Sequence, residues 1–300
     1  MEPPPPQSIA VVASAGIGDA LLMQICAHRL REIGHQTTLF SDPIHSLSDW
    51  FPNARFAPRP TTDTLTSLNT FDAILLQHDN SPLARQILQL PKPTYLIYGA
   101  HDPLKHPPLR PSLDFLCSKQ ICIAQNIQSA CSALFHTPSK NDNGITPLPH
   151  LIHRKFNTRV AIHTGSSSTK KNWLPSRFHK LQNKLIQLGF APCLVPTFPT
   201  LSELASFLYE SAFFIGNDSG PGHLASNLNI PTITIGSSRE QLTFWRPGWG
   251  PNRIVYPHPF FNKTKLTREN WKYFITTNQV LINFLKLNQN PDNLYLGGDL

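Results

Sequence analysis

Short apolar runs alternate with longer segments of helical periodicity along the chain. Residues 8–15 form an almost continuous apolar run, the pattern of a strand buried on both faces of a parallel sheet. Residues 19–33 carry leucine, isoleucine and cysteine at helical spacing, and Gly34 suits the end of a helix. The same pattern predicts further first-half strands at 37–40, 72–77 and 94–98, and helices at 82–90 and 120–135.

The second half repeats this alternation after a break. Residues 137–150 contain three prolines, two asparagines and one glycine, which is typical of a linker. Beyond it we predict strands at 159–163, 192–195, 213–216 and 232–235, and helices at 175–188, 201–210, 220–227 and 267–287. The whole pattern predicts an α/β protein with two doubly wound domains, residues 1–150 and 151–300, the second with a long closing helix.

The composition supports a folded chain and restricts its partners. Hydrophobic residues make up 40% of the 300 positions, which excludes a wholly disordered chain. The first half holds 10 basic and 11 acidic residues and the second half holds 16 and 7, so the halves carry −1 and +9 of the chain's net charge of +8. We therefore expect the second half to bind an anion: a nucleotide diphosphate, a nucleic acid or a charged lipid surface.

Other features bear on the compartment and on metals. No stretch approaches the ~18 apolar residues of a membrane span, and the five cysteines form no Cys-x-x-Cys pair. Free thiols of this kind predict a cytoplasmic protein. The 13 histidines are scattered, so we expect no metal site. Nucleic-acid binding would rest on the basic charge alone, because the chain lacks an arginine and aromatic recognition pattern.

The first motif is Gly16-Ile17-Gly18-Asp19, between the first predicted strand and helix. A dinucleotide fingerprint would lie here, but its third glycine is missing, and a carboxylate in the first helical turn competes with a phosphate for the helix N-terminus. Two interpretations of Asp19 stay open. In the first, which spacing alone slightly favours, Asp19 caps the helix or interacts with its dipole and contributes about 1 kcal/mol to stability. Otherwise it is a general base held at the carboxyl end of the sheet.

Two further motifs lie in the basic half. Residues 216–224 run from a buried strand through a glycine-rich turn into a helix, and a tight turn alone does not explain Asp218, Ser219 and His223 together. Residues 163–175 form a Gly/Ser/Thr loop with two lysines, which is either a solvated surface loop or a diphosphate site. We expect the two loops to meet at one edge of the second sheet. The predicted anion-binding residues are Gly165, Ser166, Lys171, Asp218, Ser219, Gly220 and His223.

Together these motifs resemble glycosyltransferase family 9, the lipopolysaccharide heptosyltransferase family. The likeness spans roughly residues 8–285 and rests on Gly-x-Gly-Asp-x-Leu at 16–21, Lys-x-Trp-x-Pro at 171–175 and Asn-Asp-Ser-Gly-Pro-x-His-Leu-Ala at 217–225. The resemblance implies a GT-B fold, two Rossmann-like domains with the active site in the cleft between them. It implies that the first domain takes the acceptor and the second takes the nucleotide-sugar.

The resemblance also implies roles for individual residues. Asp19 matches the catalytic base, with Gly16 and Gly18 in the same acceptor-side loop. Lys171 matches the lysine that meets the donor phosphates, and Asp218, Ser219 and Gly220 match the donor-binding turn. The chain has no Asp-x-Asp motif to hold a divalent cation, and Lys171 with the helix N-terminus at Gly220 would stabilise a leaving diphosphate without one.

The expected function is therefore an inverting, metal-independent transfer of a sugar, such as heptose, in a bacterial cell. The donor would be a nucleotide-diphosphate sugar, for example ADP-heptose, and the acceptor a lipopolysaccharide-core glycolipid. We expect no cofactor, no nucleic-acid partner, and a place in the cytoplasm or at the inner face of the inner membrane. The alternative is a non-catalytic relative that binds a nucleotide-sugar or a partner protein. Residues 196–200 favour it, because family members usually carry there an extra helix and strand with an acidic residue that contacts the nucleoside.

Overall fold

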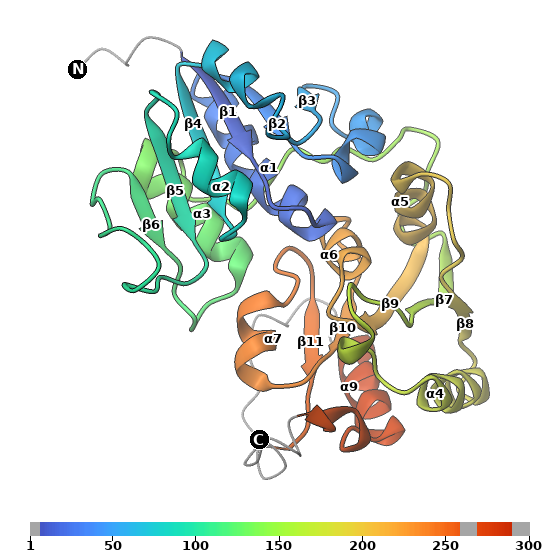
Figure 1. The fold of residues 1–300 in the computed structure, drawn as a ribbon. Coiled ribbons are helices and arrows are strands. Elements are labelled where there is room, and N and C mark those ends of the chain that lie inside the picture. The colour runs from blue at the N-terminus through green and yellow to red at the C-terminus, as the bar shows by residue number, and fades with distance from the viewer. Residues whose placement is uncertain (1–6, 259–268, 290–300) are drawn as a thin grey trace. The chain divides into compact units, whose positions relative to one another are not determined.

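The computed structural model describes residues 7–258 and 269–289, and the chain divides into two compact units (Figure 1). The first unit comprises Met1–Ser118 and Ala124–Thr146, and the second comprises Lys119–Ile123 and Pro147–Leu300. The chain thus passes finally from one unit to the other inside the segment predicted as a linker. The acceptor and donor roles of the two domains stay predictions.

The first unit is built on one parallel sheet with strand order β3-β2-β1-β4-β5-β6. Its strands are β1 Ser8–Val12, β2 Gln36–Phe40, β3 Phe56–Ala57, β4 Ala73–His78, β5 Thr94–Tyr98 and β6 Asp114–Leu116. Its helices are α1 Ile17–Glu32, α2 Pro82–Ile87 and α3 Ile123–Phe135, with 3-10 turns η1 Pro43–Trp50 and η2 Leu65–Thr70.

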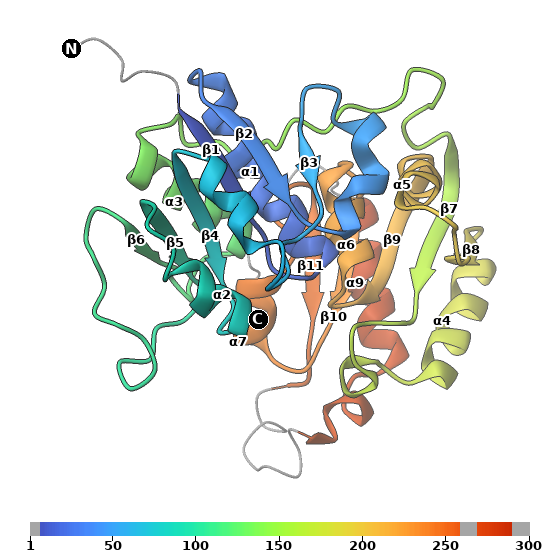
Figure 2. The ribbon, with the colours of Figure 1, turned by 45° about the horizontal axis from the view of Figure 1, so that its top comes forward.

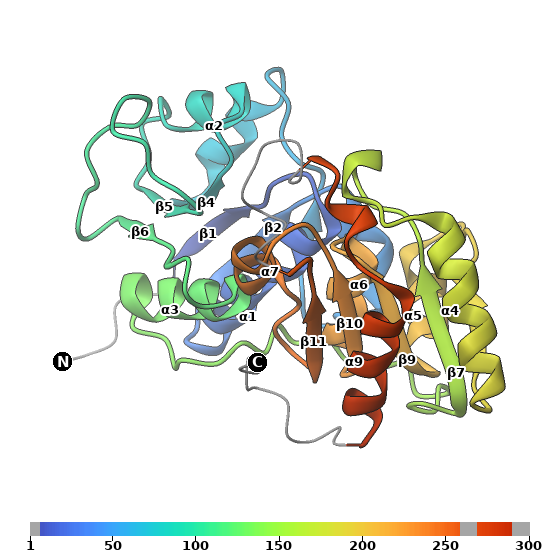
Figure 3. The same ribbon diagram turned by 90° about the horizontal axis from the view of Figure 1, so that it is seen from below.

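Helices cover both faces of this sheet, which explains the continuous apolar run of β1. One face, which includes Val12, Leu76 and Tyr98, packs against η2 and α2. Figure 3 shows α1 and α3 on the opposite face, where the thiol of Cys26 contacts the carbonyl of Ile127. A strand between two such layers exposes no side chain, and the residues from Ile9 to Val12 are all 0% exposed.

The second unit has a five-stranded parallel sheet with strand order β11-β10-β9-β7-β8. Its strands are β7 Phe156–His163, β8 Ala191–Leu194, β9 Ser211–Asn217, β10 Thr232–Ile235 and β11 Asn252–Val255. Its helices are α4 Pro175–Gln187, α5 Leu201–Tyr209, α6 Gly220–Asn227, α7 Arg239–Trp245 and α9 Thr277–Gln289, with 3-10 turns η3 Thr169–Lys171 and η5 Trp271–Tyr273.

Two helix pairs enclose the second sheet. Helices α4 and α9 pack on each other and bury one face of β7, β9 and β10, with Phe178 and Phe284 fully buried between them and the strands. Helices α5 and α6 pack on each other against β9. Figure 2 shows β8 as the outer strand beside β7. Pro192 suits this edge, because an edge strand needs no donor on its open side.

The structure corrects the closing helix. A helix was predicted over 267–287, but α9 begins at Thr277 after the 3-10 turn η5. The hydroxyl oxygen of Thr276 accepts a hydrogen bond from the backbone N–H of Gln279 at 3.1 Å, which starts the helix at this point. The predicted start at 267 and the proline-rich residues 1–6 lie outside the described residues. All five cysteines are free thiols, as predicted.

Candidate functional site

Asp19 lies in the first turn of α1, just beyond the carboxyl end of β1. A Cβ atom at Gly16 would lie 2.6 Å from Oδ2 of Asp19, so the carboxylate folds back over this glycine. Gly16 has φ −85° and ψ 153°, which any residue adopts. Glycine is therefore needed here for space and not for backbone freedom. Gly18 follows as the second residue of α1 and is half-buried.

A glutamine from the neighbouring strand holds the Asp19 carboxylate. Nε2 of Gln77, near the end of β4, donates to Oδ1 of Asp19 at 2.7 Å. Oε1 of Gln77 accepts from the backbone N–H of Ser14 at 3.1 Å. Both the Gln77 amide and the positive end of the α1 dipole stabilise the ionised carboxylate. Sequence reasoning missed Gln77, and its one signal is a polar side chain directly after the apolar run Ala73–Leu76 of β4.

A cluster of aromatic and imidazole rings lies beside β4 and β5 in the first unit. The ring centroids of His78 and Tyr98 are 4.7 Å apart, and those of His78 and His106 are 5.0 Å apart. Burial lowers the pKa of His78, and the nearby His106 lowers it further, so the His78 ring is neutral at pH 7. Next to it, Arg59 pairs with Asp79 at 2.6 Å. None of these groups was predicted as a site residue.

In the second unit, the two basic-half motifs meet. Lys171 ends η3 in the loop after β7, and Asp218 follows directly after β9, the neighbour of β7 in the sheet. Nζ of Lys171 lies 3.6 Å from Oδ2 of Asp218. The same carboxylate oxygen accepts a hydrogen bond from Nε2 of Gln241 at 3.3 Å. Because the Lys171 side chain is 44% exposed, its ammonium group has donors left for a ligand.

Asn217 fixes the two loops against each other. Its Oδ1 accepts from the backbone N–H of Trp173 at 2.9 Å, and its Nδ2 donates to the carbonyl of Thr164 at 2.7 Å. Trp173 is fully buried, and its indole N–H donates to the carbonyl of Ile275 at 3.1 Å. The position of Lys171 is thus set by a buried network. Asn217 belongs to the motif at 217–225, but the motif alone assigns it no role.

Ser219 and Gly220 form the start of α6. Ser219 is the N-cap residue, its side chain makes no cap bond to the helix, and Pro221 follows in the first turn. The first N–H groups of a helix have no intrahelical partner, so those of Ser219 and Gly220 suit an anion. Oγ of Ser219 lies 3.4 Å from Nδ1 of His163, and burial lowers the pKa of this histidine.

Three other predicted residues have local structural contacts. The hydroxyl of Ser166 lies 2.7 Å from Oδ1 of Asn172 and 2.8 Å from the carbonyl of Ser168, so it braces its own loop. A Cβ at Gly165 would make only ordinary contacts, the nearest at 3.5 Å from the His163 ring. His223 is only 6% exposed and its ring packs edge-on against Trp249 at 6.3 Å. The structure therefore brings Lys171, Asp218, Ser219 and Gly220 together and turns Ser166 and His223 toward protein contacts.

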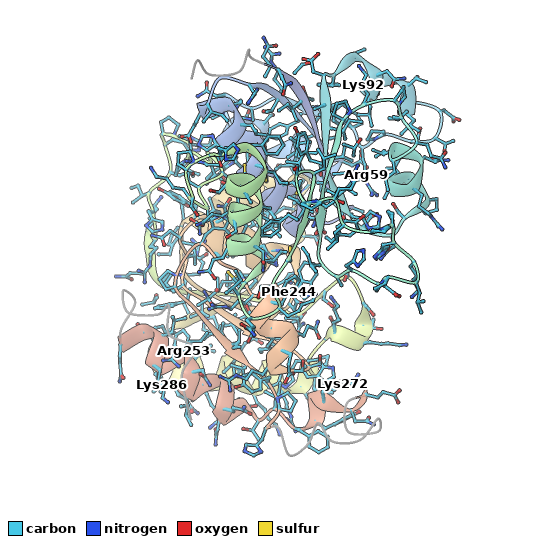
Figure 4. All side chains as sticks on the ribbon, turned by 90° about the vertical axis from the view of Figure 1, so that its left-hand side faces the viewer. Arg59, Lys92, Phe244, Arg253, Lys272 and Lys286 are labelled. Atoms are coloured by element: carbon cyan, nitrogen blue, oxygen red, sulfur yellow. The ribbon has the colours of Figure 1, made fainter. Side chains whose placement is uncertain are left out.

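The positive charge of the second unit is spread over several elements. Arg253, Lys272 and Lys286, labelled in Figure 4, come from β11, η5 and α9. Lys119 instead makes a cation–π contact, with its ammonium nitrogen 3.9 Å above the ring centroid of Phe244. The net charge of this half thus does not by itself mark the Lys171 loop, which is distinguished by its contact with Asp218 beside the start of α6.

The described residues include no metal cluster and no membrane-spanning helix. Within 7–258 and 269–289, no three His, Cys, Asp or Glu side chains gather where they could hold a metal ion. In the same part of the chain, every helix is too short or too polar to cross a bilayer.

The connection between β8 and α5, which departs from the family 9 pattern, is short and irregular. Residues 195–200 join β8 to α5 and form neither helix nor strand. The hydroxyl oxygen of Thr200 accepts from the backbone N–H of Glu203 at 3.2 Å and so caps α5. Glu203, the nearest acidic residue, thus lies in the first turn of that helix.

Comparisons by sequence find a family model that matches part of the second unit and two relatives that match over short stretches. The family model for glycosyltransferase family 9 (heptosyltransferase) matches residues 194–270. Lipopolysaccharide heptosyltransferase 3 of Escherichia coli is 37% identical over 57 residues, 19% of this chain and 16% of that relative. Lipopolysaccharide heptosyltransferase 1 of Campylobacter coli is 34% identical over 112 residues, 34% of this chain and 30% of that relative. The matched stretches thus cover less than a third of either relative.

Comparisons by structure match nearly the whole chain. A glycosyltransferase family 9 structure from Veillonella parvula has a TM-score of 0.67 at 17% identity, over 95% of this chain and 98% of that one. The Escherichia coli heptosyltransferase WaaC with ADP has a TM-score of 0.66 at 15% identity, over 94% and 99%. These matches, with the sequence comparisons, confirm the GT-B fold class and the resemblance to glycosyltransferase family 9 that the motifs predict.

Proposed function

We propose that this chain, which carries family 9 motifs on a GT-B fold, is an inverting, metal-independent glycosyltransferase. It would move a sugar from a nucleotide-diphosphate donor to a lipopolysaccharide-core-type acceptor. One observation carries the proposal: Lys171 and Asp218, from separate motifs, lie 3.6 Å apart beside the N-terminus of α6. A cation and a helix N-terminus at one edge of a parallel sheet suit a diphosphate.

The second unit would hold the donor. The Lys171 ammonium group and the N–H groups of Ser219 and Gly220 would meet the phosphates, and the Ser219 hydroxyl would donate a further hydrogen bond. Asp218 would orient Lys171, because its carboxylate is itself held by Gln241. ADP-heptose is the donor of choice to test, since a heptosyltransferase of the same fold was solved with ADP.

The first unit would supply the base. Asp19 would take the proton of an acceptor hydroxyl as that oxygen bonds to the anomeric carbon of the donor sugar. The bond from that carbon to the phosphate oxygen breaks at the same time, and the diphosphate leaves with the electron pair. Lys171 and the N-terminus of α6 would stabilise this developing charge. A single displacement of this kind inverts the anomeric centre.

The acceptor and the place of action follow from the same proposal. A lipopolysaccharide-core glycolipid resides in a membrane, so the protein would act at the inner face of the inner membrane, from the cytoplasmic side. The reaction as written uses no cofactor and no metal ion. In this reaction a carboxylate accepts the proton, and an ammonium group and backbone N–H groups stabilise the leaving diphosphate.

A transfer assay tests this proposal directly. The protein is incubated with ADP-heptose and a lipopolysaccharide core that lacks its heptose residues, and the product is followed by mass spectrometry. We expect a product heavier by one heptose from the wild-type protein and at least a hundredfold less from Asp19→Asn. If no sugar is transferred from any nucleotide-sugar, the proposal fails.

One observation favours a second candidate, a non-catalytic protein that binds a nucleotide-sugar. The short link 195–200 offers neither the helix nor the strand that usually precedes the nucleoside contact. If this second candidate is correct, the chain will bind ADP-heptose in a calorimetric titration but give no product in the transfer assay.

A further inference from the structure

We infer that Gln77 is a positioning residue of the reaction, which acts on the rate only by holding the Asp19 carboxylate. The inference rests on the proposed function, since the position of Asp19 matters to a rate only if Asp19 is the base. Gln77 lies outside all three sequence motifs.

The hydrogen bonds of Gln77 define the orientation of its amide. Nε2 donates to the Asp19 carboxylate at 2.7 Å, and Oε1 accepts from the Ser14 N–H at 3.1 Å. A flipped amide would place an oxygen against the carboxylate oxygen and an NH₂ group against the backbone N–H. Since an ionised carboxylate only accepts and a backbone N–H only donates, one orientation alone satisfies both contacts.

The glutamine is also rigidly anchored. Its side chain is 8% exposed, and its strand β4 pairs with β1 on one side and β5 on the other. It therefore connects the loop after β1, the first turn of α1 and a central strand of the sheet. Gln77 holds the Asp19 carboxylate at Oδ1, while Oδ2 lies in the space that a Cβ at position 16 would fill.

The core does not require an amide at this position. The preceding residues of β4, Ala73 to Leu76, are apolar and at most 1% exposed, so an aliphatic side chain would continue the strand. A buried amide is unfavourable unless its hydrogen bonds are made. Gln77 makes a bond to a backbone group and one to a charged group, and the second is the one that a base needs, because general-base catalysis depends on placement.

A double-mutant cycle tests the inference with the full-length protein. Gln77→Met keeps the side-chain volume and removes both hydrogen bonds. We expect it to lower kcat by about 10- to 100-fold, the scale of a misplaced catalytic group, and to leave the donor KM within about twofold. In an Asp19→Asn background the same change should lower kcat by less than about twofold, because the group that Gln77 positions is already disabled.

Two further variants separate positioning from folding. Gln77→Glu keeps an acceptor for Ser14 but places a second carboxylate against Asp19, so we expect kcat to fall at neutral pH even if Gln77→Met fails to fold. Gln89→Met, at an exposed glutamine of the same unit, should leave kcat unchanged. The inference is overturned if kcat survives both Gln77 changes, or if the Gln77→Met and Asp19→Asn effects multiply in the double variant.

A crystal structure of Gln77→Met tests the positioning role of Gln77 without any measurement of activity. We expect the Asp19 carboxylate to move by about 1 Å or more from its place over Gly16. If the wild type transfers no sugar, the proposed function fails, and this structure still shows whether Gln77 holds the carboxylate. An unmoved Asp19 would refute the positioning role even in an active enzyme.

Discussion

Nζ of Lys171 lies 3.6 Å from Oδ2 of Asp218, so two loops that are distant in sequence converge at one point. The convergence follows from topology, because β7 and β9 are neighbours in a parallel sheet and the loops after them leave its same edge. Asn217 locks the arrangement through Trp173 and Thr164. The ammonium group is thereby placed beside the first turn of α6, where an anion is most stable.

Asp19→Asn should lower turnover by about 10²–10⁴-fold, the typical contribution of a general base. The amide keeps the shape of the side chain and an acceptor for Gln77, so we expect the melting temperature and the nucleotide affinity to change little. Steady-state kinetics and thermal unfolding of the same preparations check this. A variant that loses stability but keeps its specific activity would identify Asp19 as a helix-dipole partner.

Gly16→Ala should impair turnover without unfolding the first unit. Its new Cβ would lie 2.6 Å from the Asp19 carboxylate, which has to leave its place. We expect a drop in kcat of about 10-fold or more, the cost of misplacing a catalytic group. Gly99→Ala is the matched control, since a Cβ there meets nothing within 4 Å. Equal activity of the two variants would count against the importance of the Asp19 position.

The sequence predicts much of this fold, because buried parallel strands must be apolar throughout. The apolar runs within β1, β4 and β9 follow that rule, whereas β10 alternates threonine with isoleucine and is found by its β-branched residues. Strands β3 and β6, at the edges of the first sheet, have only two and three residues, too few to show a period. The long closing helix is wrong in its start because one capping threonine, Thr276, outweighs the apolar spacing around it.

The site is less predictable than the fold. Motif reasoning predicts that the loops of Lys171, Asp218 and Ser219 converge, because the chemistry of these residues is visible in their types, and the structure brings Lys171 and Asp218 together. Motif reasoning cannot find Gln77 or Asn217, whose roles depend on which strands lie side by side. The ligand contact that the motif suggests for His223 stays a prediction, and the structure adds that its largely buried ring packs against Trp249.

Asn217→Ala should destabilise the second unit by about 2–6 kcal/mol. It leaves the backbone N–H of Trp173 and the carbonyl of Thr164 without their partner, and each such buried group costs about 1–3 kcal/mol. Urea unfolding measures the loss. Asn283→Ala, which removes one bond to a carbonyl of its own helix, should cost about 1 kcal/mol or less. Equal losses for both would show that Asn217 does not clamp the loops.

Stability should fall as the pH drops below about 6.5. Burial lowers the folded-state pKa of His163 and of His78, so the unfolded chain takes up protons first as the pH falls. These neutral rings therefore stabilise the folded state in full above their unfolded-state pKa. This stabilisation is lost as the pH falls toward their lower folded-state pKa. Urea unfolding at pH 7.5 and 5.5 measures this. His163→Asn should flatten the dependence, and the exposed His45→Asn should not. An equal slope in both variants would contradict this account of His163.

The central claim is that the second unit binds a nucleotide diphosphate at Lys171 and the start of α6. Isothermal titration calorimetry with ADP, UDP and GDP tests it most directly, with Lys171→Ala and the exposed Lys180→Ala as a matched pair. We predict that at least ADP binds the wild type, that Lys171→Ala weakens binding by about 1–3 kcal/mol, and that Lys180→Ala leaves it unchanged. The absence of binding by any diphosphate at millimolar concentration, or equal binding by the two lysine variants, would contradict the account.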